Sequence, residues 1–290
     1  MVSRKRSLPI YGLLESRGLA RRYDDQHLLL QAVQNLTLYT PPSGEQEYRF
    51  LWRGQRDDRW GLESRLYRSL IDQYDRPPTR IEFEARENEI LEAFHETSLA
   101  EDRTVLDQLA LLQHHGAPTR LLDVSTDYLP ALYFACEDAK IQSRRDGVLL
   151  AFLASAATGE LKPNADIPTV TVLRTRAAEG ALYYQPRPVT ERIRNQRAAF
   201  IVTDVPNRTS NGAMAIRWPM PDAPWKPATL QKVLSPPTTW TSGRPARPVI
   251  IGFCIAAQLK PAILSYLDRV FRINGNSVYP DIQGFVASLT

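Results

Sequence analysis

Residues 113–135 of this chain read QHHGAPTRLLDVSTDYLPALYFA. The glycine and the first proline of this stretch end a helix that leucine spacing predicts over residues 104–115. Residues 119–124 then indicate a short strand, and the polar residues 125–127 offer N-caps to a following helix, whose first turn tolerates the second proline. The stretch therefore predicts a helix, a turn, a short strand and a second helix in succession.

Strand and helix patterns continue on both sides of this stretch. Residues 147–153 form a continuous apolar run, which is typical of a buried strand. Residues 81–99 predict a helix in which apolar side chains and Glu87 form one stripe. Further strands are predicted at residues 48–53, 170–173, 199–205 and 249–255, with a helix near 257–268. A length of 290 residues suits two domains or one large α/β or α+β domain.

The predicted elements divide the chain in two. Residues 1–45 are expected to be a helical lead-in, because QHLLLQAVQNL places leucine and valine at helical spacing before prolines and a glycine. The main domain is expected over residues 46–290. Within it, residues 206–248 hold 9 of the 22 prolines. We expect an irregular excursion there rather than a linker, because strand-like sequence resumes after it.

Composition excludes several classes of protein. With 43% hydrophobic residues the chain can bury a sizeable core, yet no run of ~18 apolar residues could span a bilayer. The basic start has only a short apolar stretch broken by Pro9 and Gly12, which does not fit a secretory signal, so a cytoplasmic location without membrane contact is expected. Cys136 and Cys254 are too few for a disulfide framework or a four-ligand zinc site.

Charge is distributed unevenly along the chain. Residues 1–150 carry 20 basic against 24 acidic side chains, and residues 151–290 carry 16 against 8. Of the 36 basic residues 30 are arginine, whose planar guanidinium suits bidentate phosphate contacts. Codon bias in a GC-rich genome would produce the same excess. The basic second half thus permits a nucleotide or nucleic-acid partner without requiring one.

Two clusters of polar residues could carry chemistry. Arg53 follows a strand pattern and precedes Gly54, so a sharp turn there would deliver a guanidinium to the end of the sheet. His115, Arg120 and Asp123 are expected to form a polar cluster beside that position, in which charged groups satisfy one another. Adjacent histidines at 114 and 115 point about 100° apart on a helix, which argues against a shared metal.

The same segments resemble the FRG domain family, named for a Phe-Arg-Gly motif. Trp52-Arg53-Gly54-Gln55 matches the opening motif with tryptophan in place of phenylalanine, and residues 113–135 match the long central motif almost throughout. Asn195-Gln196 with Phe200, and Tyr279-Pro280-Asp281 with Gly284, resemble the later motifs. The resemblance covers residues 46–290 and by itself implies no particular reaction.

The order of motifs also resembles the arginine-containing class of ADP-ribosyltransferases. In that class an Arg-Gly ends one strand, a Ser-Thr-Ser strand leads into a helix, and a later strand bears a catalytic glutamate. Arg53-Gly54 resembles the first motif and Ser125-Thr126 the second, whereas the third position offers Gln196, with Glu191 upstream. This resemblance implies an α+β fold with a transferase-like split mixed sheet and flanking helices.

The transferase resemblance and the polar residues singled out above together suggest a set of site residues. Those expected to bind NAD, as substrate and without a metal, are Arg53, Gly54, Gln55, Arg120, Ser125, Thr126 and Tyr133. Those expected to act in catalysis are His115, Asp123 and Gln196. Arg53, Thr126 and Gln196 should therefore line one cleft. A neutral glutamine would stabilise the oxocarbenium-like transition state less well than a carboxylate.

Three functions follow as hypotheses. The first is an NAD-using ADP-ribosyltransferase or NAD glycohydrolase, with a bacterial toxin or an antiphage effector as its setting. The second is a noncatalytic module that binds a nucleotide or nucleic acid through Arg53, Arg120 and the basic second half. The third is a metal-independent nuclease that uses His115 and Asp123. Rossmann, P-loop, α/β-hydrolase and zincin motifs do not occur in the sequence.

Overall fold

The structure is a computed structural model of the 290-residue chain. It describes residues 7–9, 17–38, 49–58, 60–97, 100, 103–137, 145–154, 159–161, 167, 169–179, 182–186, 190–202, 215–217 and 249–281. Most of the proline-rich segment predicted at 206–248 lies outside these residues. Within the described part of the chain, no helix is long and apolar enough to cross a membrane.

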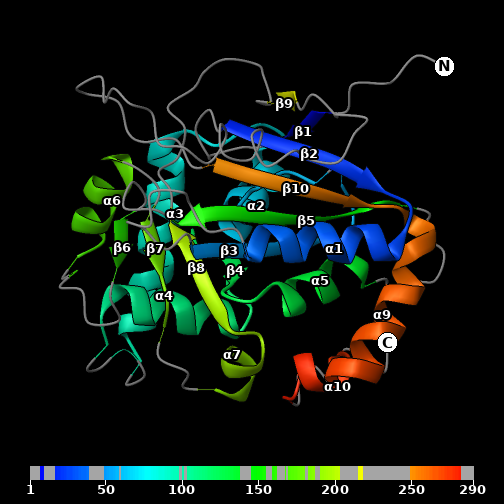
Figure 1. Cartoon of the computed structure of the whole chain (residues 1–290). Coiled ribbons are helices and arrows are strands. Elements are labelled where there is room, and N and C mark those ends of the chain that lie inside the picture. Colours follow the sequence, from blue (N-terminus) through cyan, green and yellow to red (C-terminus); the bar gives the residue numbers. More distant parts are fainter. Residues whose placement is uncertain are drawn as a thin grey trace, which may run out of the picture.

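One mixed sheet runs through the molecule in the order β2-β10-β5-β3-β4-β8-β7-β6 (Figure 1). Parallel pairing joins β10 to β2 and β7 to β6, whereas the other neighbours are antiparallel. The strands are β2 (Arg17–Tyr23), β3 (Arg49–Gln55), β4 (Leu122–Ser125), β5 (Gly147–Ala154), β6 (Gly159–Leu161), β7 (Leu182–Tyr184), β8 (Ala198–Val202) and β10 (Val249–Ile255). A separate antiparallel pair joins β1 (Ser7–Pro9) to β9 (Ala215–Arg217).

Helices flank the sheet, and α1, α5 and α9 share one hydrophobic cluster with its central strands. The helices are α1 (Gln26–Thr37), α2 (Arg65–Tyr74), α3 (Arg80–His95), α4 (Val105–His114), α5 (Tyr128–Cys136), α6 (Val170–Glu179), α7 (Glu191–Asn195), α9 (Lys260–Phe271) and α10 (Gly275–Val278), with a 3-10 turn at Ala257–Leu259. Asp127 caps α5 by accepting a hydrogen bond from the Leu129 amide, within the predicted cap. The α+β class, with a mixed sheet flanked by helices, is confirmed.

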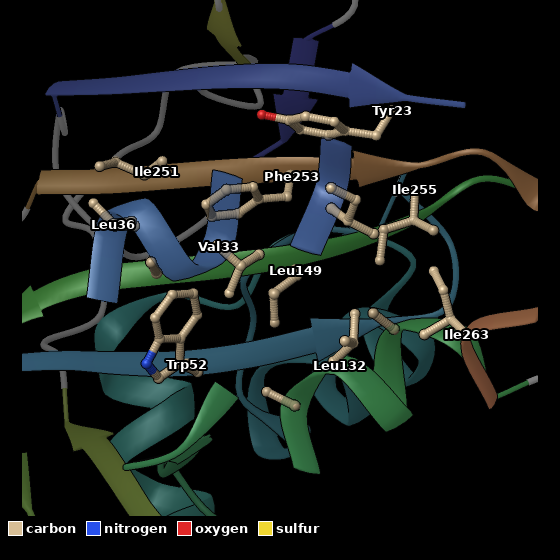
Figure 2. Close-up of a cluster of buried hydrophobic side chains, with 14 of the residues drawn as sticks. Tyr23, Val33, Leu36, Trp52, Leu132, Leu149, Ile251, Phe253, Ile255 and Ile263 are labelled. Carbon is tan, nitrogen blue, oxygen red and sulfur yellow. The ribbon is translucent and has the colours of Figure 1, made fainter. Parts of the chain in front are cut away.

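The core lies on both faces of the central strands. In Figure 2, Trp52 of β3, Leu149 of β5 and Phe253 of β10 lie in the cluster that α1 and α5 cover with Val33 and Leu132. The alternate residues of β5, such as Leu150, are buried in a second cluster on the other face. This burial on both faces explains why the sequence of β5 is continuously apolar, as predicted.

Gly54 lies inside β3, and this corrects the sharp turn predicted there. A Cβ atom on Gly54 would lie 1.8 Å from the Ala131 carbonyl oxygen and 2.5 Å from the Ala135 nitrogen. Both atoms belong to the backbone of α5, so the helix packs directly on the strand at this residue. The glycine therefore serves close approach of two elements rather than a change of chain direction.

Three other predictions on elements need correction. Residues 17–23, expected in a helical lead-in, form edge strand β2 because β10, from the far end of the chain, pairs with them. Residues 170–173, predicted as a strand, begin helix α6, which buries Leu173 against α4 and β8. The strand predicted at 119–124 is β4, shifted to Leu122–Ser125. The lead-in helix itself is found as α1, and the division at residue 46 stays a prediction.

Candidate functional site

The main candidate site is a cavity of about 630 Å³ where β3 and β4 separate. The two strands pair only at Trp52 and Ser125 and then diverge. Side chains of α5, α7 and the segment after α10 reach the same space. The lining residues are Trp52, Arg53, Gly54, Gln55, Arg56, Trp60, Arg65, Arg68, Gln113, Asp123, Val124, Ser125, Ala131, Phe134, Glu137, Arg192, Gln196, Ala198 and Tyr279. A cavity of this size fits a small-molecule ligand.

Arg53 bridges the gap between the two strands. Its Nη1 donates a hydrogen bond of 2.7 Å to the Asp123 carbonyl oxygen, and its Nε donates one of 3.0 Å to Gln55 Oε1. Burial lowers the pKa of Arg53 to about 10, against the opposing effect of the nearby Asp123 carboxylate. The guanidinium is still a cation at neutral pH, and no described carboxylate forms an ion pair with it. An anionic ligand would compensate its desolvation.

Further arginines concentrate positive charge around the cavity. Arg56, Arg65 and Arg68 also line it, and none of them forms an ion pair with a described acidic residue. Arg192, at the α7 side, pairs loosely with Asp281, at 3.5 Å between Nη1 and Oδ2. Five arginines thus face two carboxylates across one space. Such an excess favours a polyanionic ligand, and guanidinium groups bind phosphate in a bidentate manner.

The two carboxylates of the cavity have different surroundings. Asp123 Oδ1 accepts a hydrogen bond of 2.8 Å from Gln113 Nε2, and Gln113 Oε1 in turn accepts one from the Thr119 hydroxyl. Glu137 Oε2 accepts a hydrogen bond of 3.0 Å from the Tyr279 hydroxyl. Burial raises the pKa of Glu137, although the bond from Tyr279 and the charges of two arginines lower it.

Aromatic rings and amides complete the lining. The Trp60 ring is 48% exposed, and the Arg56 guanidinium lies 5.2 Å from its centroid. Phe134 and Tyr279 pack edge to face at 6.0 Å between ring centroids. The Gln196 side chain donates to the Val278 carbonyl oxygen at 3.0 Å, which joins α7 to α10. The exposed Trp60 ring beside Arg56 is suited to stacking on a base or another flat ring.

A family model describes the part of the chain that builds most of this cavity. The FRG domain model matches residues 48–144, from the strand of Arg53 to just beyond Glu137. This chain contains an FRG domain. Arg192, Gln196 and Tyr279, which line the opposite side, lie beyond the matched residues. No curated protein and no solved structure matches the chain.

The fold brings six of the predicted site residues of the FRG domain protein together. Arg53, Gly54, Gln55, Asp123, Ser125 and Gln196 all line the cavity. Ser125 links three elements, because its hydroxyl donates to the Gln196 carbonyl at 2.8 Å and accepts from the Asp127 amide at 3.0 Å. The predicted cleft residues Arg53 and Gln196 therefore share one space.

The remaining four predicted residues do not line the cavity. Thr126 donates from its amide to the Arg197 carbonyl, beside the cavity. Tyr133 lies on α5 with its hydroxyl close to Gly275 of α10. His115 caps α4 and packs its ring against His114. Arg120 is buried and pairs with Glu87 on α3. Binding and catalytic roles for these four stay predictions.

The predicted polar cluster of His115, Arg120 and Asp123 is wrong as a group. Arg120 donates both Nε and Nη2 to Glu87, at 2.5 Å each, whereas Asp123 pairs with Gln113. Arg120 lies before the start of β4. The alternation of side chains between the two faces of a strand therefore does not determine the direction of its side chain. The counter-ion of Arg120 is therefore Glu87 on α3 and not a member of the predicted cluster.

Sequence reasoning missed three kinds of lining residue in this FRG domain protein. Glu137 follows the helix predicted within residues 113–135. Its carboxylate is a signal of a site, which the interpretation of this segment as a helix alone leaves out. Tyr279 belongs to a motif already noticed, but its contact with Glu137 joins distant segments. Arg65 and Arg68 lie one helical turn apart on α2, a spacing that places both on one face. Among the described residues, no group of three His, Cys, Asp or Glu side chains could hold a metal.

Proposed function

We propose that the cavity binds NAD and that the protein cleaves its nicotinamide–ribose bond, as an ADP-ribosyltransferase or an NAD glycohydrolase. The observation that carries this proposal is the meeting of arginines, aromatic rings and carboxylates in one cavity. Arginines suit the diphosphate, rings suit the adenine or nicotinamide, and a carboxylate suits the positive charge that develops on the ribose. Depletion of NAD, or transfer of its ADP-ribose to an acceptor, would make the protein a toxin or an antiphage effector.

Arg53 is the residue best placed to bind the diphosphate. It lies on a central strand, its orientation is fixed by Asp123 and Gln55, and no described carboxylate neutralises it. A ligand phosphate would therefore meet a cation that needs little reorganisation. Arg56 and Arg68, from neighbouring segments, would add positive charge to the same space.

A noncatalytic nucleotide-binding module is the second candidate, because one observation favours it. Gln196, at the place of the transferase glutamate, is neutral, and its amide is engaged by the Val278 carbonyl. If the residue at the third motif of the transferase resemblance serves only to join α7 to α10, the site would bind a nucleotide without cleaving it. The same arginines could also receive the phosphates of a nucleic acid, as binding that weakens with salt would reveal.

An Arg53→Lys variant tests binding. Lysine keeps the charge but loses the bidentate fork and the bond to Asp123, so we expect the Kd for NAD to rise about tenfold by calorimetry. Arg86→Lys is the control, because Arg86 lies exposed on α3 in a pair with Glu89. An Arg53→Lys Kd equal to that of the wild type would remove Arg53 from the proposed phosphate site.

Nicotinamide release from NAD by the wild-type protein tests turnover. We expect release that depends on protein concentration, with or without an added acceptor. Measurable NAD binding without release would favour the noncatalytic module. The absence of NAD binding would contradict both NAD proposals and leave nucleic-acid binding, which titration with DNA and RNA at several salt concentrations would examine.

A further inference from the structure

Glu137 is one of the two carboxylates that line the cavity. Its Oε2 accepts from Tyr279, and no described residue donates a hydrogen bond to its Oε1. Asp123, the other cavity carboxylate, also has one oxygen bonded, Oδ1 by Gln113, but its charge acts on Arg53, the proposed phosphate-binding guanidinium. Gln196 carries no charge at all. Among the described lining residues, Glu137 is thus the anion whose surroundings suit direct contact with a substrate.

The backbone gives Glu137 a fixed place. It is the C-cap residue of α5, and its amide donates to the Tyr133 carbonyl at 2.7 Å. Helix α5 is in turn held against β3 at Gly54, the residue next to Arg53. The carboxylate and the proposed phosphate-binding guanidinium therefore belong to two elements in direct contact. Such rigidity is what a catalytic group needs to meet a bound substrate.

We propose that Glu137 is the catalytic carboxylate of this cavity, an inference that rests on the proposed NAD-cleaving function. In the hydrolytic reaction the bond between ribose C1′ and the nicotinamide nitrogen breaks, and its electron pair leaves with the nitrogen, which neutralises the pyridinium. Water forms a bond to C1′ through its oxygen and gives one proton to Glu137, which passes it to solvent. The products are ADP-ribose, nicotinamide and one proton. The ionised carboxylate also stabilises the positive charge on the ribose.

Tyr279 is the positioning residue for Glu137. Its hydroxyl holds one carboxylate oxygen, and the Arg192 guanidinium lies 5.2 Å from its ring centroid. The charged and titratable groups around the carboxylate are Tyr279, Tyr133, Arg56 and Arg192. Burial raises the pKa of Glu137, and the hydrogen bond from Tyr279 and the charges of both arginines oppose that rise by favouring the ionised form, which is the form that accepts a proton.

Glu137→Gln tests the inference, because glutamine keeps the shape and can still accept a bond from Tyr279. We expect nicotinamide release to fall at least about 100-fold, the usual scale for a general base, while the Kd for NAD changes less than about twofold. Glu96→Gln is the control, since Glu96 is likewise a helix C-cap, on the exposed end of α3. Its release should equal that of the wild type.

Tyr279→Phe adds a readout that a merely structural role would not move. Loss of its hydrogen bond raises the pKa of Glu137 further, so the acid limb of the profile of release rate against pH should shift to higher pH. Wild-type release by Glu137→Gln would overturn the inference and leave the NAD-cleaving function standing. A wild-type protein that binds NAD without releasing nicotinamide would overturn both.

Discussion

Gly54→Ala is expected to destabilise the protein by about 4 kcal/mol, because a methyl group at this site has no room. The added Cβ would lie 1.8 Å from the Ala131 carbonyl oxygen and 2.5 Å from the Ala135 nitrogen. Backbone atoms cannot turn away as a side chain can, so α5 or β3 must move as a whole. Since α5 carries Phe134 and Glu137 and β3 carries Arg53, ligand binding should weaken along with stability.

Thermal unfolding measures this effect. A loss of about 4 kcal/mol should lower the Tm by about 10 °C for a chain of this size. Gly275→Ala is the matched control, because the nearest atom to its added Cβ would be the Tyr133 hydroxyl oxygen at 3.4 Å and its backbone is helical. We expect an unchanged or slightly higher Tm for that variant. A wild-type Tm for Gly54→Ala would contradict the direct packing of α5 on β3.

Elements with a clear period and clear ends could be predicted from the sequence. The apolar run 147–153 is found as β5, and the cap at 125–127 is found at the start of α5. In both cases the local pattern and the tertiary environment favour the same structure. The burial of Glu87 in the apolar stripe of α3 was also predictable, although its partner Arg120 was not.

Elements that depend on distant partners could not be predicted. Residues 170–173 include the β-branched residues that are typical of a strand, yet they begin a helix that packs in one hydrophobic cluster with α3 and α4. That helix places Leu173 in the core and Arg174 against Glu87 on α3. Strand β2 forms because it pairs with β10. The sequence of residues 17–23 does not indicate that pairing. Tertiary contacts thus override local preference in both segments.

The site was predictable where a polar residue follows a strand pattern. Arg53, Asp123 and Ser125 were found in this way, and the divergence of β3 from β4 brings them into one cavity. The missing side chain of Gly54 matters in the structure, as the sequence indicates, but it allows the close approach of α5 and not a turn. The pairing of Glu137 with Tyr279 could not be predicted, because it joins two segments through the fold alone.

Glu87→Ala should be about as damaging as the change at Gly54, for an electrostatic reason. The Glu87 and Arg120 side chains are each 1% exposed, and Arg174 Nη2 also donates to Glu87 Oε2, at 3.0 Å. Removal of the carboxylate would leave two buried or nearly buried guanidinium groups without their shared counter-ion. Breaking a buried pair in this way costs about 3–5 kcal/mol.

Denaturant unfolding of Glu87→Ala and Glu89→Ala separates this effect from the loss of a helical glutamate. Glu89 lies on the same helix and pairs with Arg86, but the two side chains are 61% and 48% exposed. Water therefore screens that pair, and its loss should cost less than about 1 kcal/mol. Equal stabilities of the two variants would contradict a buried charge network at Glu87. A large loss of stability confined to Glu87→Ala would indicate that Arg120 has a structural function. Its charge would then serve to join α3 to the segment before β4 through Glu87.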